Sequence, residues 1–239
     1  MWLLSNKIPV ADSGILDGFC DWHCHLLPGV DDGVQKTEET LQILEEWELL
    51  GVKEVWLTPH IMEDYPNCPD DLRKRREELT TRYTGRVKLH LAAEHMMDGL
   101  FTKRLEQNEV MPIGSAGKGL LVETSYYTPP INLRKVIDSV RAKNYEPLLA
   151  HPERYQYMDR QHYRQWKEKG VLFQLNLPSV VGAYGPEVQR KADWLLKEGM
   201  YDYCGTDIHS IDQLGLFLNS EINKKTVKLV KKLSENQDL

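Results

Sequence analysis

The sequence has few cysteines and no long apolar run. Its four cysteines, Cys20, Cys24, Cys68 and Cys204, form no C-x-x-C pair, so free thiols in a reducing compartment are expected. No stretch approaches the roughly 20 consecutive apolar residues of a membrane helix. Residues 1–9 lack the basic start and the apolar length of a signal peptide. We therefore expect a cytoplasmic protein that does not insert into a membrane.

Several catalytic motifs are also missing. No Gly-rich loop follows the first apolar run, as a doubly wound nucleotide-binding fold would require, and no G-x-S-x-G motif marks a serine hydrolase. Cysteine-based phosphatases carry an arginine six residues after the catalytic thiol. The residues at those positions here are Leu26, Val30, Lys74 and Ser210. A thiol nucleophile is therefore not expected.

Positive charge is not in excess. The formal net charge is -6, whereas a protein that binds nucleic acid needs concentrated Lys and Arg to displace counterions. The basic run at residues 73–76 is followed directly by Glu77 and Glu78, so we expect it on a solvated helix face. Nucleic acid is not an expected partner.

The chain does contain a regular alternation of short apolar runs and amphipathic stretches. Seven runs are predicted to be strands, and most of them are apolar on both faces, as in a buried parallel sheet: 18–25, 54–58, 88–92, 120–123, 147–150, 171–176 and 202–205. Helices are predicted over 37–50, 69–83, 102–107, 132–143, 159–169, 186–197 and 224–233. Thr37 is the predicted N-cap of the first helix and Gly51 its stop. No repeat or linker divides the chain, so one domain over 1–239, with an N-terminal extension over 1–18, is expected.

This alternation predicts an α/β fold with a closed or nearly closed parallel barrel, whose active site would lie at the C-terminal ends of the strands. Candidate ligands follow short apolar runs at His60, Glu94, Glu123 and His151. Buried carboxylates need cations or hydrogen bonds for compensation. A metal cluster would supply the cations.

Two closely spaced pairs strengthen the metal hypothesis. His23 and His25 lie two residues apart, as do Asp207 and His209. In extended backbone each pair presents both side chains in the same direction. Imidazole and carboxylate ligands without nearby thiols suit Mn, Fe or Zn in a hydrolytic site. The histidines expected to lie outside the site are His90, His95 and His162.

The chain resembles the polymerase-and-histidinol-phosphatase (PHP) superfamily. More closely, it resembles the bacterial manganese-dependent protein-tyrosine phosphatases encoded with capsular and extracellular polysaccharide genes. The matching stretches are Asp21-Trp22-His23-Cys24-His25, Gly29-Val30-Asp31-Asp32-Gly33, Thr58-Pro59-His60, Ala93-Glu94, Leu121-Val122-Glu123, Ala150-His151-Pro152-Glu153-Arg154-Tyr155 and Thr206-Asp207-Ile208-His209. The resemblance implies a distorted seven-stranded parallel (β/α) barrel of PHP type.

The resemblance also implies three metal ions per chain, most simply Mn²⁺, with Fe or Zn as alternatives. The implied ligands are His23, His25 and Asp207 for the first ion; Glu94 as a bridge to the second; Glu123 and His151 to complete the second; and Asp32, His60 and His209 for the third. Spacing alone does not choose between Asp31 and Asp32.

The implied activity is hydrolysis of protein phosphotyrosine by attack of a metal-bridging hydroxide. The implied substrate is the tail of a bacterial tyrosine kinase that controls capsular or extracellular polysaccharide synthesis. Glu94 and Asp207 would act through the ions, and Arg154 is placed to bind the substrate phosphate. Tyr126 and Tyr127 could stack on the phosphotyrosine ring or pack against a neighbouring loop.

Two departures from this pattern stand out. About twenty residues precede the H-x-H pair, and residues 211–215 lack the arginine that these phosphatases tend to carry after the D-x-H pair. Three alternatives stay open: a small-molecule phosphatase of the histidinol-phosphatase type, a nuclease-type phosphodiesterase, and an inactive metal-bearing binding module.

Overall fold

The computed structural model describes residues 6–235 and 237. The strands are β1 (Lys7–Pro9), β2 (Cys20–Cys24), β3 (Glu54–Leu57), β4 (His60–Ile61), β5 (Lys88–Leu91), β6 (Glu94–Met96), β7 (Gly119–Glu123), β8 (Glu146–Ala150), β9 (Leu172–Asn176), β10 (Tyr203–Gly205) and β11 (Glu221–Asn223). The helices are α1 (Thr37–Leu49), α2 (Pro69–Arg82), α3 (Phe101–Glu106), α4 (Leu133–Ala142), the 3₁₀ turn η1 (Pro152–Arg154), α5 (Arg160–Glu168), α6 (Leu177–Val180), α7 (Pro186–Lys197), α8 (Ile211–Asn219) and α9 (Lys224–Ser234).

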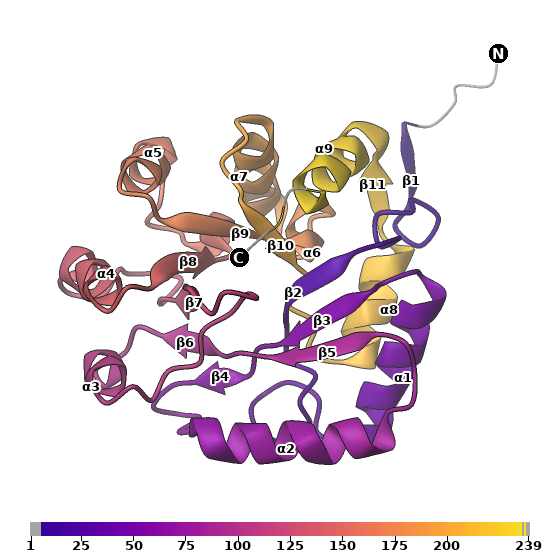
Figure 1. The fold of residues 1–239 in the computed structure, drawn as a ribbon. Helices are drawn as coiled ribbons and strands as arrows, with labels where there is room; N and C mark the ends of the chain where they lie inside the picture. The colour runs from indigo at the N-terminus through magenta and orange to yellow at the C-terminus, as the bar shows by residue number, and fades with distance from the viewer. Residues whose placement is uncertain (1–5, 236, 238–239) are drawn as a thin grey trace.

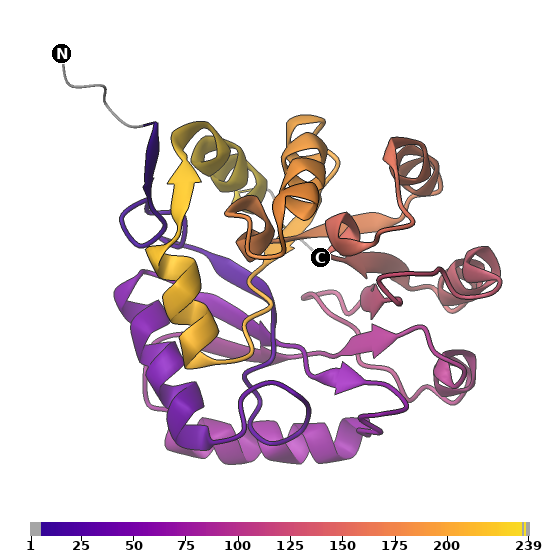
Figure 2. The ribbon, with the colours of Figure 1, turned by 180° about the vertical axis from the view of Figure 1, so that it is seen from behind.

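The parallel strands form two sheets at the centre of the molecule, with the helices around them (Figures 1 and 2). The larger sheet has the order β10-β9-β8-β7-β6-β4 and the smaller one β2-β3-β5. The two sheets adjoin where Cys24 of β2 forms a parallel bridge to Ile208. At the same junction the carboxylate of Asp21 accepts hydrogen bonds from the backbone N–H (2.8 Å) and the hydroxyl (2.6 Å) of Thr206. This buried contact joins the first parallel strand to the last.

Each of the seven predicted runs contains a strand, but the strands are not arranged as one seven-stranded sheet. In the second run, strand β3 ends at Leu57, and the chain forms a further strand, β4, from His60. In the third run, β5 ends at Leu91, and β6 begins at Glu94, so β4 and β6 lie beyond the predicted runs. Pro59 has no N–H to donate to a ladder, which explains the first interruption. The result is a six-stranded and a three-stranded parallel sheet.

The predicted helices are confirmed to within two residues at each end, with one correction. Lys36, not Thr37, occupies the N-cap of α1, and it makes no side-chain cap. Gly51 does follow the last turn with φ +88°, a conformation that favours glycine. Helices α6 and α8 were not predicted. Helix α8 begins after Ser210, whose hydroxyl accepts a hydrogen bond from the backbone N–H of Gln213.

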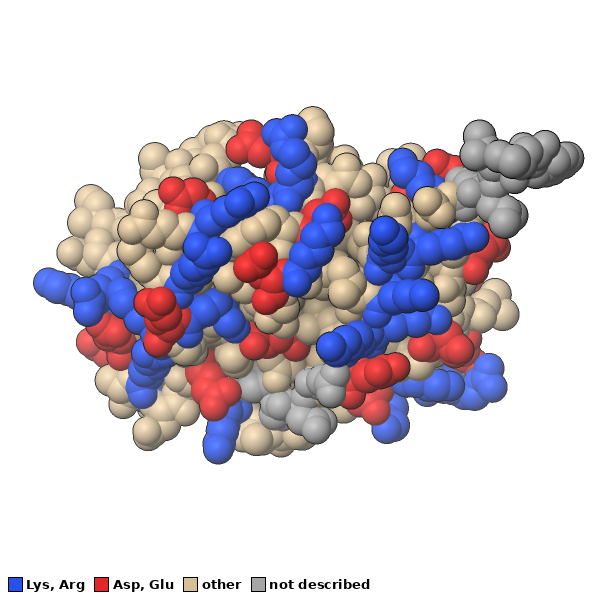
Figure 3. Space-filling view, turned by 90° about the horizontal axis from the view of Figure 1, so that it is seen from above, with Lys and Arg blue, Asp and Glu red and all other residues tan. Residues whose placement is uncertain are grey.

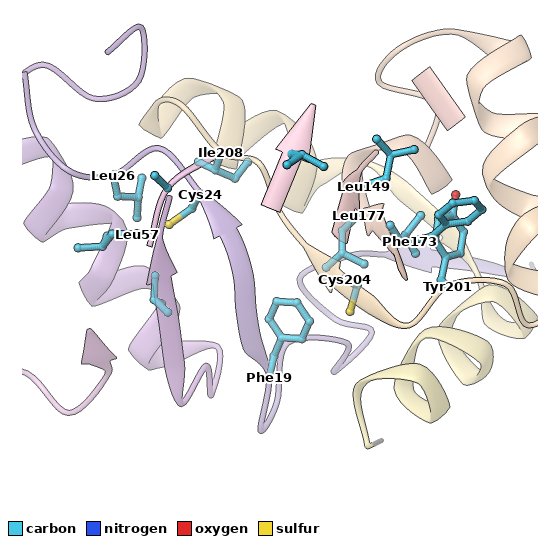
Figure 4. Packing of buried hydrophobic residues seen from close by; sticks show 14 of the residues in the cluster. Phe19, Cys24, Leu26, Leu57, Leu149, Phe173, Leu177, Tyr201, Cys204 and Ile208 are labelled. Carbon is cyan, nitrogen blue, oxygen red and sulfur yellow. The ribbon is translucent and has the colours of Figure 1, made fainter. Parts of the chain in front are cut away.

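The core fills the space between the strands and the ring of helices. Figure 4 shows Phe19, Leu57 and Phe173 in this packing, together with the thiols of Cys24 and Cys204. Burial raises the pKa of Cys24, and it raises that of Cys204 to about 12. All four cysteines are free, and these two behave as small apolar residues.

The described residues ahead of β2 are packed against the rest of the domain. Strand β1 pairs antiparallel with β11 near the other end of the chain, and Val10, Ile15 and Leu16 are buried in the main core. Among the described residues, no helix has both the length and the apolar character needed to span a bilayer. The face over α5, α7 and α9 carries Lys and Arg side chains interspersed with Asp and Glu (Figure 3).

Candidate metal centre

The nine candidate ligands converge at one end of the parallel strands. His25, Glu123, His151 and Asp207 lie at or just beyond the ends of strands β2, β7, β8 and β10. Four overlapping groups have ligand atoms within 4.8 Å of one another: His25-Asp32-His60-His209, His23-His25-Asp207, His23-Glu94-His151 and His60-Glu94-Glu123. All nine residues from the sequence are therefore brought together.

Glu94 lies at the middle of the cluster, with its side chain buried. Its Oε1 lies 3.0 Å from Nε2 of His151. Its Oε2 lies 3.2 Å from Nε2 of His23 and 3.4 Å from Nε2 of His25. The two oxygens of one carboxylate thus face two different sets of nitrogen atoms, as in a carboxylate that bridges two ions.

His23 lies in β2 and His25 directly follows it, as their spacing predicts, whereas Asp207 and His209 lie beyond β10 and Asp207 has left-handed backbone (φ +53°) in place of the predicted extended backbone. Three ligand atoms from the two pairs nevertheless meet. The Nε2 atoms of His23 and His25 are 3.1 Å apart. Oδ1 of Asp207 lies 3.4 Å from the first and 3.3 Å from the second. Ligand atoms bound to one ion at about 2.1 Å lie roughly 3.0–3.4 Å from one another, so this triangle has the dimensions of a metal site.

A more open group lies at the rim. Oδ1 of Asp32 is 3.5 Å from Nε2 of His60 and 3.7 Å from Nε2 of His209, and the Asp32 side chain is 51% exposed. The other ring nitrogen of His60 faces inward, 3.2 Å from carboxylate oxygens of both Glu94 and Glu123. This buried Nδ1 makes no hydrogen bond to the described residues. A cation between His60, Glu94 and Glu123 would give this nitrogen a partner. The nine candidate ligands include no thiol, so the residues present fit Mn, Fe or Zn.

Two side chains orient the H-x-H imidazoles from behind. Nδ1 of His25 donates to Oδ2 of Asp31 at 2.9 Å, and Nδ1 of His23 donates to Oε1 of Gln174 at 2.6 Å. These bonds leave Nε2 of each ring facing the cluster. The structure thus separates Asp31 from Asp32. Gln174 was missed, although a glutamine within the apolar run of β9 was a usable signal.

The pKa values of several residues in the cluster are strongly shifted. Burial would lower the pKa of His23, but the carboxylates of Glu94 and Asp207 raise it to about 9. Burial would raise the pKa of Glu94 and of Asp207, but the surrounding imidazoles, His23 foremost, hold both well below their usual range. Burial and the nearby His25 lower the pKa of His209 to about 4. Such shifts gather where charges are held together in a functional site.

Two of the candidate ligands have unusual backbone conformations. His151 has φ +35° and Asp207 has φ +53°. Non-glycine residues adopt left-handed backbone only at an energetic cost, and such residues cluster at functional sites. At these two positions the backbone adopts a less stable conformation, and this conformation directs the side chains of His151 and Asp207 into the cluster.

Arg154 reaches the cluster from η1, the turn after β8. Its Nη1 donates to Oδ2 of Asp207 at 2.7 Å, so it does not pair with the adjacent Glu153. Its Cζ lies over the rings of Tyr126, at 4.4 Å, and Tyr184, at 4.3 Å. In the part of the chain that the structure describes, no other Lys or Arg lies within ion-pairing distance of the nine candidate ligands.

The remaining candidates divide as follows. Tyr126 packs beside Arg154 and His151, which is the packing role considered for it, while Tyr127 is 70% exposed. The three histidines set aside in the sequence lie outside the ligand groups: His90 pairs with Glu54, His95 bonds the backbone of Leu121 and Met111, and His162 caps α5 with Asp159. Tyr184, on the loop after α6, carried no signal in the sequence.

Comparison with known proteins identifies the family of this chain. Residues 19–236 match the family model described as capsular polysaccharide synthesis, CpsB/CapC. The chain is 23% identical to tyrosine-protein phosphatase YwqE of Bacillus subtilis over 197 residues, which cover 80% of this chain and 77% of that protein. It is 25% identical to tyrosine-protein phosphatase CpsB of Streptococcus agalactiae over 217 residues, which cover 83% and 86%.

A solved structure shares the fold. It comes from the work on YwqE of Bacillus subtilis and CpsB of Streptococcus pneumoniae, described as metal-dependent tyrosine phosphatases. The TM-score is 0.75 at 20% identity, with 92% of this chain and 96% of that chain covered.

Proposed function

This chain belongs to the capsular polysaccharide synthesis family CpsB/CapC, and from that premise we propose that it is a metal-dependent phosphomonoesterase acting on protein phosphotyrosine. The observation that carries the proposal is the buried Glu94, whose two oxygens face separate groups of imidazoles. A single structural ion would not need a carboxylate that faces two groups of ligands. A bridging carboxylate suits the paired ions that catalyse hydrolysis of phosphate esters.

We propose three Mn²⁺ ions, with Fe or Zn as alternatives. The proposed ligands are His23, His25 and Asp207 for the first ion, Glu94 shared with the second, Glu123 and His151 for the second, and Asp32, His60 and His209 for the third. The separations of 3.1–3.4 Å within the first group support this division. The wider separations around Asp32 support a third site that is more open to solvent.

In this proposal the protein side chains have three tasks. The nine ligands hold the ions, Asp31 and Gln174 keep Nε2 of His25 and His23 turned toward them, and Arg154 binds the phosphoryl oxygens. Bound ions would supply Lewis acidity and lower the pKa of water at the cluster. Because a phenolate leaves more easily than an alkoxide, an aryl phosphate makes little demand on a general acid. The site could therefore serve phosphotyrosine without one.

We further propose that the substrate is the tail of a bacterial tyrosine kinase controlling capsular or extracellular polysaccharide synthesis, and that the protein acts in the cytoplasm as a single domain. The family membership supports the first point. We also propose that the two parallel sheets represent one distorted seven-stranded barrel of PHP type. The bridge between Cys24 and Ile208, and the continuation of β3 as β4 and β5 as β6, support that description.

The proposal is tested by assaying the purified protein, supplied with Mn²⁺, on a phosphotyrosine peptide, histidinol phosphate and single-stranded DNA. We expect the peptide to be hydrolysed fastest and a chelator to abolish the activity. Faster turnover of histidinol phosphate would assign the protein to small-molecule phosphatases, and cleavage of DNA would assign it to phosphodiesterases. Metal binding without turnover of any of the three would indicate a binding module.

A further inference from the structure

In the described part of the chain, Arg154 is the one Lys or Arg that forms an ion pair with a candidate ligand, and two aromatic rings flank it. The Arg154 side chain is 18% exposed, with Tyr126 and Tyr184 each at about 4.3–4.4 Å from its Cζ. Among the described residues, the guanidinium makes a single hydrogen bond, to Asp207. Since guanidinium carries five N–H donors, most remain available for phosphoryl oxygens. Hydrogen bonding alone therefore does not fix its orientation.

The two rings belong to different parts of the chain. Tyr126 lies in the loop after β7, and its ring also packs against His151 and Tyr155. Tyr184 lies in the loop between α6 and α7, between Gly182 (φ +86°) and Gly185 (φ +92°). These left-handed backbone conformations, which favour glycine, give the loop its tight turn.

Tyr184 is also connected to the ligand set by a hydrogen bond. Nδ2 of Asn176, the last residue of β9, donates both to the hydroxyl of Tyr184, at 3.2 Å, and to Oδ2 of Asp207, at 2.8 Å. The same carboxylate oxygen accepts from Arg154. Ring, arginine, carboxylate and amide thus form a closed set of contacts beside the proposed first ion.

We propose that Tyr184 is a positioning residue that, together with Tyr126, holds the guanidinium of Arg154 ready to receive the phosphoryl group of the substrate. The contact between a cation and an aromatic face restricts the arginine without consuming its N–H donors. The restriction matters because, among the described residues, no other Lys or Arg forms an ion pair with the candidate ligands. This inference rests on the proposed function, in which Arg154 binds phosphate.

The test compares Tyr184→Leu, which removes the ring, with Tyr184→Phe, which keeps the ring and loses the hydroxyl. With full metal content, Tyr184→Leu should lower kcat/KM for an aryl phosphate by about tenfold and weaken inhibition by inorganic phosphate by a similar factor. Tyr184→Phe should stay within about threefold of the wild type. The matched control is Trp194→Leu, because Trp194 underlies Arg160 and Arg164 on α5, away from the metal centre. That variant should leave both quantities unchanged.

A double-mutant cycle separates positioning from a general structural effect. In an Arg154→Ala background, Tyr184→Leu should cause little further loss, since the ring would have no guanidinium to hold. Additive losses, or unchanged phosphate inhibition in Tyr184→Leu, would overturn the positioning role while leaving the proposed function intact. Near-normal kinetics of Arg154→Ala itself would instead remove the phosphate-binding role on which the inference rests.

Discussion

Asp31 accepts a hydrogen bond at 2.9 Å from Nδ1 of His25, the ring nitrogen that faces away from the metal centre. The backbone N–H groups of Gly33 and His60 also donate to this carboxylate. Burial would raise the pKa of Asp31, but the imidazole of His25 lowers it to about 2. Asp31 therefore stays ionised and fixes the tautomer of a proposed metal ligand.

Replacing Asp31 should weaken metal binding without removing a ligand. We expect Asp31→Asn to lower the affinity for Mn²⁺ by roughly 10–100-fold, as is usual when the outer partner of a ligating histidine is lost. Metal titration followed by calorimetry measures this. Unchanged affinity with correct folding would show that His25 does not need Asp31 for its orientation.

Replacing Glu94 should remove more metal than replacing Asp32. The carboxylate of Glu94 faces two groups of nitrogens, whereas Asp32 is half exposed and faces only the rim histidines. Elemental analysis after metal supplementation should give two to three ions for the wild type, with a larger loss in Glu94→Ala than in Asp32→Ala. Equal losses in the two variants would argue against a bridging role.

Activity should not depend on any cysteine. Cys24 and Cys204 are buried with raised pKa values, and so neither supplies a thiolate at neutral pH. We expect the quadruple change of Cys20, Cys24, Cys68 and Cys204 to Ala or Ser to retain hydrolysis of an aryl phosphate, provided that it folds. Loss of activity in a folded, metal-loaded variant would point to a thiol nucleophile.

Arg154→Ala should keep the metals but lower kcat/KM by on the order of 10²-fold, equivalent to roughly 2.7 kcal/mol. Arg154→Lys should recover only part of this, because an ammonium group cannot bind two oxygens in the bidentate manner of a guanidinium. Steady-state kinetics and metal analysis on the same samples provide the comparison. Full recovery by lysine would mean that only charge is required.

His95 should make the metal-free protein less stable in acid. Its Nδ1 donates to the carbonyl of Leu121 and its Nε2 accepts from the N–H of Met111, and burial lowers its pKa to about 4. The unfolded histidine titrates near 6.5. Its contribution to stability is therefore complete above about pH 6.5 and is lost as the pH falls toward 4, where the unfolded chain binds the extra proton.

Denaturant unfolding in the presence of a chelator checks this expectation. Between pH 7.5 and pH 5 the wild type should lose about 2 kcal/mol more of its free energy of unfolding than His95→Gln does. Equal losses would mean that His95 titrates normally in the folded protein.

The local pattern of apolar and polar residues was enough to predict most of the helices and strands. Each predicted apolar run contains a strand, because burial on both faces leaves a continuous apolar signature. Strands β4 and β6 were not predicted, because the apolar runs end at residues 58 and 92 and these two strands are only two and three residues long. Helix α8 was missed because Gly215 and the polar residues near its start obscure the helical period, although Ser210 offered a capping signal.

Site residues could be predicted where a His, Asp or Glu lies at the end of an apolar run. Residues whose role depends on contacts with other parts of the fold could not be predicted. His60 and Glu123 could be proposed from their positions. Asp31 and Asp32 are neighbours in one loop, and only the direction of each side chain separates their roles. Tyr184 reaches Arg154 across a loop whose course is set by tertiary packing.

The hydrogen bond from the hydroxyl of Thr206 to the carboxylate of Asp21 joins two residues that are 185 positions apart in the sequence. At the usual pace of translation, of about 5–20 residues per second, roughly 10–40 seconds separate the synthesis of its two partners. His23 and His25 are made at the beginning of that interval and Asp207 at its end. We therefore expect a nascent chain that ends before Asp207 to lack a ligand of the proposed first ion, so that this site would be completed only after the D-x-H pair has been synthesised.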